Sequence, residues 1–179
     1  MLFEIQTYGK DVLRTKTEEI PQIDDDLRVF VANMFETMYA AEGIGLAAPQ
    51  VDKSIRLFVI DLSPIDEEEG RRVFVNPQII GFGDEKDEYE EGCLSVPTIR
   101  EIVTRPTTIR ITYQDMNGKH YDEEIDGFLA RVIQHEYDHL EKTLFIDHLS
   151  SLKKSLLKNT LKKIASGEIE VEASENFEL

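Results

Sequence analysis

The stretch DGFLARVIQHEYDHLEK, residues 126–142, combines a long apolar pattern with two histidines and several acids. Its apolar residues recur at the spacing of an α-helix and cover more than one face of it, which predicts a helix buried at the centre of the fold. Asp126, just before the apolar pattern, is a suitable N-cap. We therefore expect the other elements to pack around this helix.

The same helix carries the pattern of a metal site. His135 and His139 are four positions apart, so both rings point to one side of the helix and can reach one ion. Glu136 lies about 100° around the helix from His135, close enough to hold a water molecule beside that ion. The alternative is a charged helix face, but these three side chains would be costly to bury without a metal or a dense hydrogen-bond network.

A catalytic metal usually has three protein ligands, so a third must come from another segment. The candidates are His120 on a predicted hairpin, His148 after the helix, acids in loops, and Cys93 in the segment EGCLSVP. A thiolate is the strongest of these donors for zinc or ferrous iron. A packed core thiol explains Cys93 equally well, so residue chemistry alone leaves both interpretations open.

Composition limits the class of protein. A chain of 179 residues with 41% hydrophobic and 31% charged residues suits one domain, and no apolar run approaches the roughly 20 residues of a membrane span. The first residues lack the pattern of a signal peptide, so we expect a cytoplasmic protein with no membrane contact. A net charge of -16 argues against nucleic-acid binding by the surface as a whole. The single cysteine excludes an intrachain disulfide.

The segments before the central helix predict a helix followed by strands. Residues 24–41 have a helical apolar period, and residues 55–61 (IRLFVID) and 71–80 (RRVFVNPQII) read as strands. We interpret the acidic runs at residues 66–69 and 84–91 as solvated loops, which is typical of like-charge clusters.

A hairpin and a last helix complete the expected fold. TTIRITYQ and KHYDEEI flank an Asn-Gly turn, which predicts a β-hairpin. A helix is predicted over about residues 151–166, with Leu152, Leu156 and Ile164 facing inward. The sequence thus predicts one α+β domain over residues 1–167, with mostly antiparallel strands packed around a central metal-binding helix, and a frayed acidic tail over residues 168–179.

Three segments together carry a family resemblance. GIGLAAPQ (Gly43–Gln50), EGCLSVP (Glu91–Pro97) and QHEYDHL (Gln134–Leu140) resemble, in order and spacing, the three motifs of the peptide deformylase family. The opening TYGKDVLR and the later LFIDHLS are also similar to that family. The resemblance implies a metal-dependent hydrolase that removes the N-formyl group from the initiator methionine of nascent polypeptides and releases formate.

The resemblance also implies a role for each matching residue. Glu136 would be the general base and later the proton donor to the leaving amine. Gln50 and the backbone N–H of Leu94 would stabilise the oxyanion, a task that needs aimed hydrogen-bond donors. One divalent ion, Fe2+ in the cell or alternatively Zn2+, Ni2+ or Co2+, would be bound by Cys93, His135 and His139.

The substrate-binding residues implied by the resemblance surround these groups. Glycines in GIGLAAPQ allow the close approach of an extended peptide backbone. Ordinary core packing is the alternative for the apolar members, and a solvated strand arginine is the alternative for the arginine. The predicted substrate-binding residues are Gly43, Ile44, Gly45, Arg100, Phe128 and Val132.

Two features leave questions open. The family commonly has glycine at the position of Lys142, so the resemblance does not define how the central helix ends. The predicted last helix carries Lys153, Lys154, Lys158, Lys162 and Lys163 in an otherwise acidic chain. These lysines suggest a weak contact with ribosomal RNA, with a solvated helix face as the alternative.

Two other functions fit parts of the pattern. A zinc peptidase of the H-E-x-x-H type needs a further ligand downstream, and the only later histidine is His148. A protein with a structural metal site normally has a fourth protein ligand, and the chain has no second cysteine. If metal binding and turnover survive replacement of Cys93 by serine, the deformylase interpretation is wrong. Replacement of Glu136 tests the structural alternative, because a structural protein would keep its partner binding and have no turnover to lose.

Overall fold

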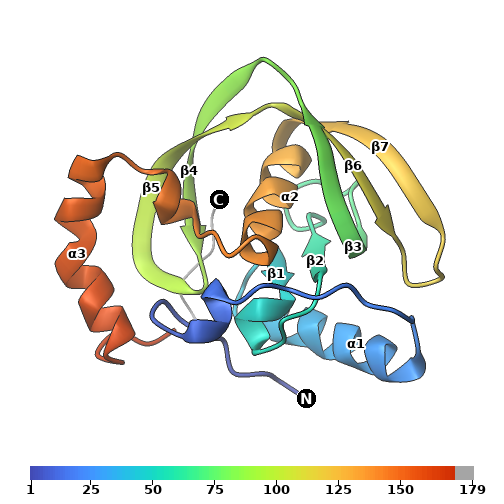
Figure 1. Cartoon of the computed structure of the whole chain (residues 1–179), viewed down its shortest axis with the longest axis horizontal. Helices are drawn as coiled ribbons and strands as arrows, with labels where there is room; N and C mark the ends of the chain where they lie inside the picture. The colour runs from blue at the N-terminus through green and yellow to red at the C-terminus, as the bar shows by residue number, and fades with distance from the viewer. Residues whose placement is uncertain (172–179) are drawn as a thin grey trace.

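The computed structural model describes residues 1–171, which form three α-helices and two antiparallel sheets (Figure 1). The helices are α1 (Asp25–Ala40), α2 (Gly127–Leu140) and α3 (Ser151–Ala165). The strands are β1 (Gly45–Ala47), β2 (Leu57–Asp61), β3 (Arg71–Phe82), β4 (Lys86–Cys93), β5 (Val96–Pro106), β6 (Thr108–Gln114) and β7 (His120–Asp126). Single 3₁₀ turns are η1 (Asp11–Arg14), η2 (Ala48–Val51) and η3 (Phe145–His148). The predicted α+β class is confirmed, and within the described part of the chain no helix is long and apolar enough to cross a membrane.

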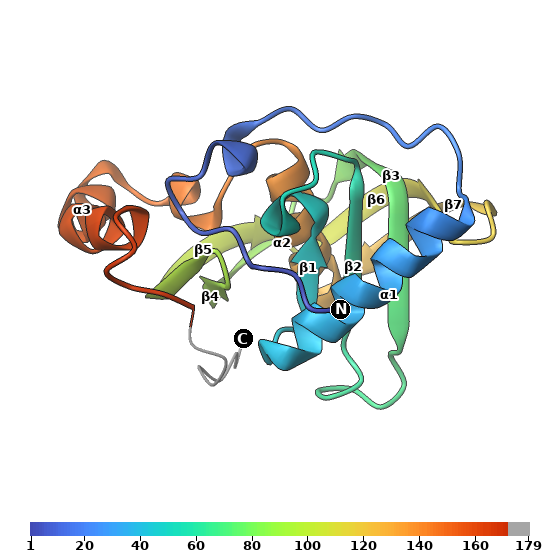
Figure 2. The same cartoon turned by 90° about the horizontal axis from the view of Figure 1, so that it is seen from below.

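The larger sheet, in the order β1-β2-β3-β6-β7, is covered on both faces. All five residues of β2 are buried. Phe58 and Ile60 belong to the hydrophobic cluster that includes α2, whereas Leu57 and Val59 belong to the cluster that includes α1. Alternate side chains of a strand point to opposite faces, so burial on both sides explains the uninterrupted apolar run of β2. Figure 2 shows α1 lying across the strands.

Helix α2 is the central helix that the sequence predicts. Its apolar residues Leu129, Val132 and Ile133 are buried in the cluster formed with the larger sheet. Asp126 occupies the N-cap position, but its side chain makes no capping hydrogen bond. Asp126 is also paired with Thr108 at the end of β7, so it is the last residue of the strand as well as the N-cap of the helix.

The end of α2 accommodates Lys142 without glycine. Lys142 has a φ of 61°, in the left-handed region that glycine adopts most easily. The N–H of Thr143 donates to the carbonyl of Asp138 at 2.8 Å, and Arg14 donates to the carbonyl of Lys142 at 2.8 Å. These hydrogen bonds hold a conformation that costs an L-residue about 1–2 kcal/mol. The helix therefore ends as a glycine-capped helix would.

The acidic run at residues 84–91 is not the solvated loop that we predicted. Most of it forms β4, which pairs with β5 to make the second sheet. The first five residues of β4 are exposed, so their charges stay in water, but Glu91 is fully buried. Arg105 and Arg131 neutralise Glu91, and both lie far from it in the sequence. A local charge pattern cannot reveal such partners, which is why the prediction failed.

Helix α3 packs with a different face from the predicted one. Ile164 is buried as expected. Leu152 and Leu156 are 71% and 75% exposed, so the prediction that they face inward is wrong. The inward face instead includes Leu157 and Leu161, which pack with Ile164 on the cluster of the β4–β5 sheet. The spacing of these three residues, four and then three, is itself that of one helix face.

The chain beyond α3 begins with two contacts to the helix end. The amides of Glu168 and Ile169 both donate to the carbonyl of Lys163, at 2.9 and 3.3 Å. Residues 172–179, which make up most of the predicted tail, lie outside the described residues.

Candidate metal centre and active site

Three buried side chains from two segments converge beside α2. Cys93 ends β4, while His135 and His139 lie one helical turn apart on α2. One ligand atom of each residue lies within 4.8 Å of the others, so this group could hold a metal ion. The Cys93 Sγ is 3.4 Å from the His139 Nε2. The structure thus brings together the three predicted metal ligands.

The other candidates for the third ligand lie elsewhere. His120 is exposed on β7 and contacts Gln114 across the hairpin at 3.0 Å. His148 lies on η3, where its Nε2 contacts Asp138 at 2.8 Å. Cys93 is therefore the candidate that the geometry favours, and the interpretation of it as a packed thiol does not account for the two histidines beside it.

The donor set and its surroundings fit a divalent transition metal. A thiolate with two imidazoles suits zinc or ferrous iron. Within residues 1–171, two buried side-chain polar atoms have no hydrogen-bond partner: Glu136 Oε2 and His139 Nδ1. A buried carboxylate oxygen without a partner is costly, so a polar occupant is expected at the point that Glu136 faces.

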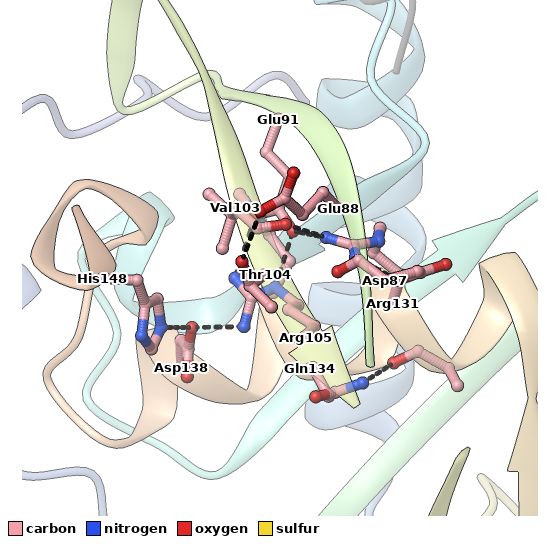
Figure 3. A network of polar contacts seen from close by, with 12 residues as sticks. Asp87, Glu88, Glu91, Val103, Thr104, Arg105, Arg131, Gln134, Asp138 and His148 are labelled. Atoms are coloured by element: carbon pink, nitrogen blue, oxygen red, sulfur yellow. Dashed lines mark hydrogen bonds and ion pairs between the residues drawn. The ribbon is translucent and has the colours of Figure 1, made fainter. Parts of the chain in front are cut away.

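Glu91 orients the ring of His135. Its Oε2 lies 3.1 Å from His135 Nδ1, which leaves Nε2 of that ring as the remaining donor atom. Arg105 donates to both oxygens of Glu91, at 2.6 and 2.9 Å, and Arg131 donates to Oε1 at 2.8 Å. Figure 3 shows Glu91 between these two arginines. A carboxylate behind a metal-binding histidine is a usual arrangement.

The sequence prediction missed Glu91 and its two arginines. One signal was available, because a metal-binding histidine usually has an acceptor for its second ring nitrogen, and Glu91 is only two residues from Cys93. The arginines had no local signal, since Arg105 lies on β5 and Arg131 is on the buried side of α2.

Burial and neighbouring charges determine the protonation states. Burial raises the pKa of Glu136 to about 7. Burial and the neighbouring His135 lower the pKa of His139 well below 6.5, so the ring is neutral, as a metal ligand must be. Although burial disfavours the ionised form of Glu91, its hydrogen bonds to His135 and Arg105 hold its pKa well below the usual value. Glu91 therefore stays charged at neutral pH.

Residues of the GIGLAAPQ segment border the site. Gln50 is buried, and its Oε1 accepts from the N–H of Ala47 at 2.8 Å, which fixes the orientation of the amide. Its Nε2 therefore points toward Cys93 Sγ at 3.6 Å. Gly45 lies against Glu136, since a Cβ at this glycine would fall 2.4 Å from Glu136 Oε1. The glycine is thus required for the position of the carboxylate.

The apolar residues predicted for the substrate pocket are largely core residues. Ile44 and Val132 are buried in the cluster that α2 forms with the larger sheet. Phe128 is only partly buried, and its ring lies 5.6 Å from that of Tyr89. Phe128 is therefore the most accessible of these three residues.

The remaining predicted residues lie around Cys93. Leu94 follows Cys93 directly and is buried against the α1 cluster. A Cβ at Gly43 would fall 3.0 Å from the Cδ1 of Leu94, so these two residues are in contact. Arg100 lies on β5, where its Nε donates to Glu90 Oε2 at 3.1 Å.

Known proteins match this chain over most of its length. The sequence profile of polypeptide deformylase matches residues 2–155. A peptide deformylase of Cytophaga hutchinsonii is 48% identical over 171 residues, covering 94% of this chain and 93% of the relative, and one of Salinibacter ruber is 42% identical over 181 residues, covering 96% and 93%. The crystal structure of a peptide deformylase from Synechococcus elongatus in complex with actinonin has a TM-score of 0.83 and 39% identity, covering 88% of this chain and 87% of that chain. As its three motifs predict, this chain belongs to the peptide deformylase family, whose enzymes remove the N-formyl group from nascent polypeptides.

Proposed function

We propose that this deformylase uses one divalent metal ion held by Cys93, His135 and His139, and that the substrate is the formylated initiator methionine of a nascent chain. The observation that supports this most is the convergence of three buried ligand atoms within 4.8 Å of one another. A divalent ion at this point would supply Lewis-acid chemistry, acidifying a water molecule and polarising the formyl carbonyl. Following the family resemblance, we assign Fe2+ as the cellular metal, with Zn2+, Ni2+ or Co2+ as substitutes.

Glu136 is the proposed general base. Its Oε2 is buried and accepts no hydrogen bond within residues 1–171, so it is free to take a proton. Burial raises its pKa to about 7, and a cation beside it would favour the ionised form. In the hydrolysis, the oxygen of water bonds to the formyl carbon and the carbon–nitrogen bond breaks. Glu136 carries one proton of the water to the leaving amine, and the other stays on formic acid, which loses it to solvent and leaves as formate.

Gln50 and the backbone N–H of Leu94 are the proposed oxyanion donors. Attack on the formyl carbon places negative charge on its oxygen, and fixed donors stabilise that charge. The bond from Ala47 to Gln50 Oε1 supports this role, because it turns Nε2 of Gln50 toward the site, where it donates to Ser95 Oγ at 3.1 Å and points toward Cys93 Sγ at 3.6 Å. Leu94 follows Cys93 in the chain, so its amide lies beside the same point.

Substrate binding is assigned to the residues around this group. The backbone at Gly43 and Gly45 would pair with the extended peptide. Ile44, Phe128 and Val132 would contact the methionine side chain, with Phe128 as the most accessible of the three. Arg100, on the β4–β5 hairpin, would contact the peptide beyond the methionine.

We also propose where the enzyme acts. Its substrates are nascent chains, so we place it in the cytoplasm near ribosomes, with residues 1–167 as one catalytic domain. The lysines of α3 support a weak contact with ribosomal RNA, since α3 is acid-free in a chain of net charge -16. Ribosome co-sedimentation should weaken with added salt and on removal of α3, and co-sedimentation insensitive to both would contradict this contact.

The test is anaerobic purification with metal analysis and a formate-release assay on a formyl-methionyl peptide. We expect one metal ion per chain and formate release, and a loss of about 10²–10⁴-fold in turnover for Glu136→Gln with the metal retained. Cys93→Ser should lose metal and turnover together, whereas a peptidase that ligates elsewhere would retain both. A protein with a structural metal would show no turnover to lose, and absence of formate from fully metallated protein contradicts the proposal.

A further inference from the structure

A line of hydrogen-bonded side chains connects the metal site to the protein surface. Glu91 accepts hydrogen bonds from the His135 ring and from Arg105. The Nη1 of Arg105 also donates to Asp138 Oδ2 at 2.9 Å. The same oxygen of Asp138 lies 2.8 Å from the Nε2 of His148. Figure 3 shows this line from His148 through Asp138 and Arg105. The Arg105 side chain is 4% exposed, whereas that of His148 is 39% exposed.

Arg105 is the rigid connection in this line. Its guanidinium is planar, and it uses Nε and Nη2 for Glu91 and Nη1 for Asp138. Because the three donors have fixed relative directions, the position of Asp138 helps to determine how Arg105 presents the other two. A shift of Asp138 is therefore transmitted to Glu91, and from Glu91 to the ring of His135.

Asp138 has few partners that could hold it. Within residues 1–171, its carboxylate makes side-chain hydrogen bonds only with Arg105 and His148. Asp138 lies on α2 three residues after His135, while His148 comes from η3. His148 is thus the single side chain that restrains Asp138 from the solvent side. Without it, water would take its place and the carboxylate could rotate.

We propose that His148 is a positioning residue for the metal centre. By holding Asp138 against Arg105, it fixes Glu91 and so orients the His135 ring. This inference rests on the proposed metal site. Loss of a group that bonds directly to a metal-binding histidine typically costs 10–100-fold in metal affinity. His148 acts through three intervening residues, so we expect His148→Leu to lose metal about threefold to tenfold faster than the wild type.

The experiment measures zinc loss from the zinc-loaded full-length protein to a chromogenic chelator. His148→Leu removes the hydrogen bond, whereas His148→Gln retains a side-chain N–H donor and should restore most of the slow rate. His120→Leu is the matched control, because His120 is an exposed histidine bonded to Gln114 on the β6–β7 hairpin, away from this line. In Co2+-substituted protein, His148→Leu should also shift the visible absorption of the metal, and His120→Leu should not.

A merely structural role for His148 predicts a different outcome. It would lower the melting temperatures of the metal-free and zinc-loaded proteins equally and leave the zinc dissociation rate unchanged. That result, or zinc loss from His148→Leu no faster than from His120→Leu, overturns the inference. If His148→Leu does not fold, Asp138→Asn carries the same expectation and the same refutation. Failure of the wild type itself to hold zinc would instead overturn the proposed metal site.

Discussion

Replacement of Gly45 by alanine should impair catalysis by displacing Glu136. An added Cβ at this position would fall 2.4 Å from Oε1, 2.8 Å from Cδ and 3.0 Å from Cγ of Glu136. Ordinary van der Waals contact begins at 3.4 Å, so the carboxylate must move by about 1 Å. A misplacement of about 1 Å can cost about 10²-fold in rate, which corresponds to about 2.7 kcal/mol in the activation free energy.

The assay for Gly45→Ala is formate release from a formyl-methionyl peptide, with metal content and melting temperature measured on the same sample. We expect full metal content, because the three atoms nearest to the added Cβ all belong to Glu136, which is not one of the three proposed ligands. Gly70→Ala is the matched control, since a Cβ at Gly70 would meet nothing within 4 Å. If Gly45→Ala keeps its rate within about threefold of the wild type, or loses activity only because it loses metal, the argument for the position of Glu136 is refuted.

Two further predictions concern stability. Although partial burial favours the neutral acid, the hydrogen bond from Arg14 holds the pKa of Asp147 below its usual value. The contribution of ionised Asp147 to the free energy of unfolding is therefore fully present above about pH 4, and it is lost as the pH falls through the folded-state pKa. Urea unfolding of Asp147→Asn should show a deficit of at most about 1 kcal/mol at pH 7 that shrinks in acid, because both groups are partly exposed; a deficit that grows in acid would contradict the sign. Ile164→Ala should cost about 2–5 kcal/mol and Leu156→Ser less than about 0.5 kcal/mol in the free energy of unfolding, and equal costs would contradict the observed orientation of α3.

The elements that the sequence predicts well are those with a strong local pattern. Helix α2 and the β6–β7 hairpin carry a continuous apolar period and an Asn-Gly turn, and both form as expected. Helix α3 forms too, but its inward face is chosen by the β4–β5 sheet, which the sequence pattern did not reveal. Helix α3 has leucines on more than one face, so the face that is buried depends on the element against which the helix packs.

In the candidate site too, residues in local motifs could be predicted, whereas a residue whose role depends on distant partners could not. The ligands Cys93, His135 and His139 could be predicted because each lies in a short local motif, although it is the fold of β4 against α2 that brings them together. Glu91 has the same sequence signature as the exposed acids before it on β4, yet among them only Glu91 is buried. What distinguishes it is the pair of buried arginines from β5 and α2, whose cost of burial is offset by carboxylates and, for Arg131, also by the backbone carbonyls of Asp87 and Val103. For His135 the second ring nitrogen takes a carboxylate as its acceptor, and the burial of that carboxylate in turn requires the buried arginines, so a search for this network can start from His135.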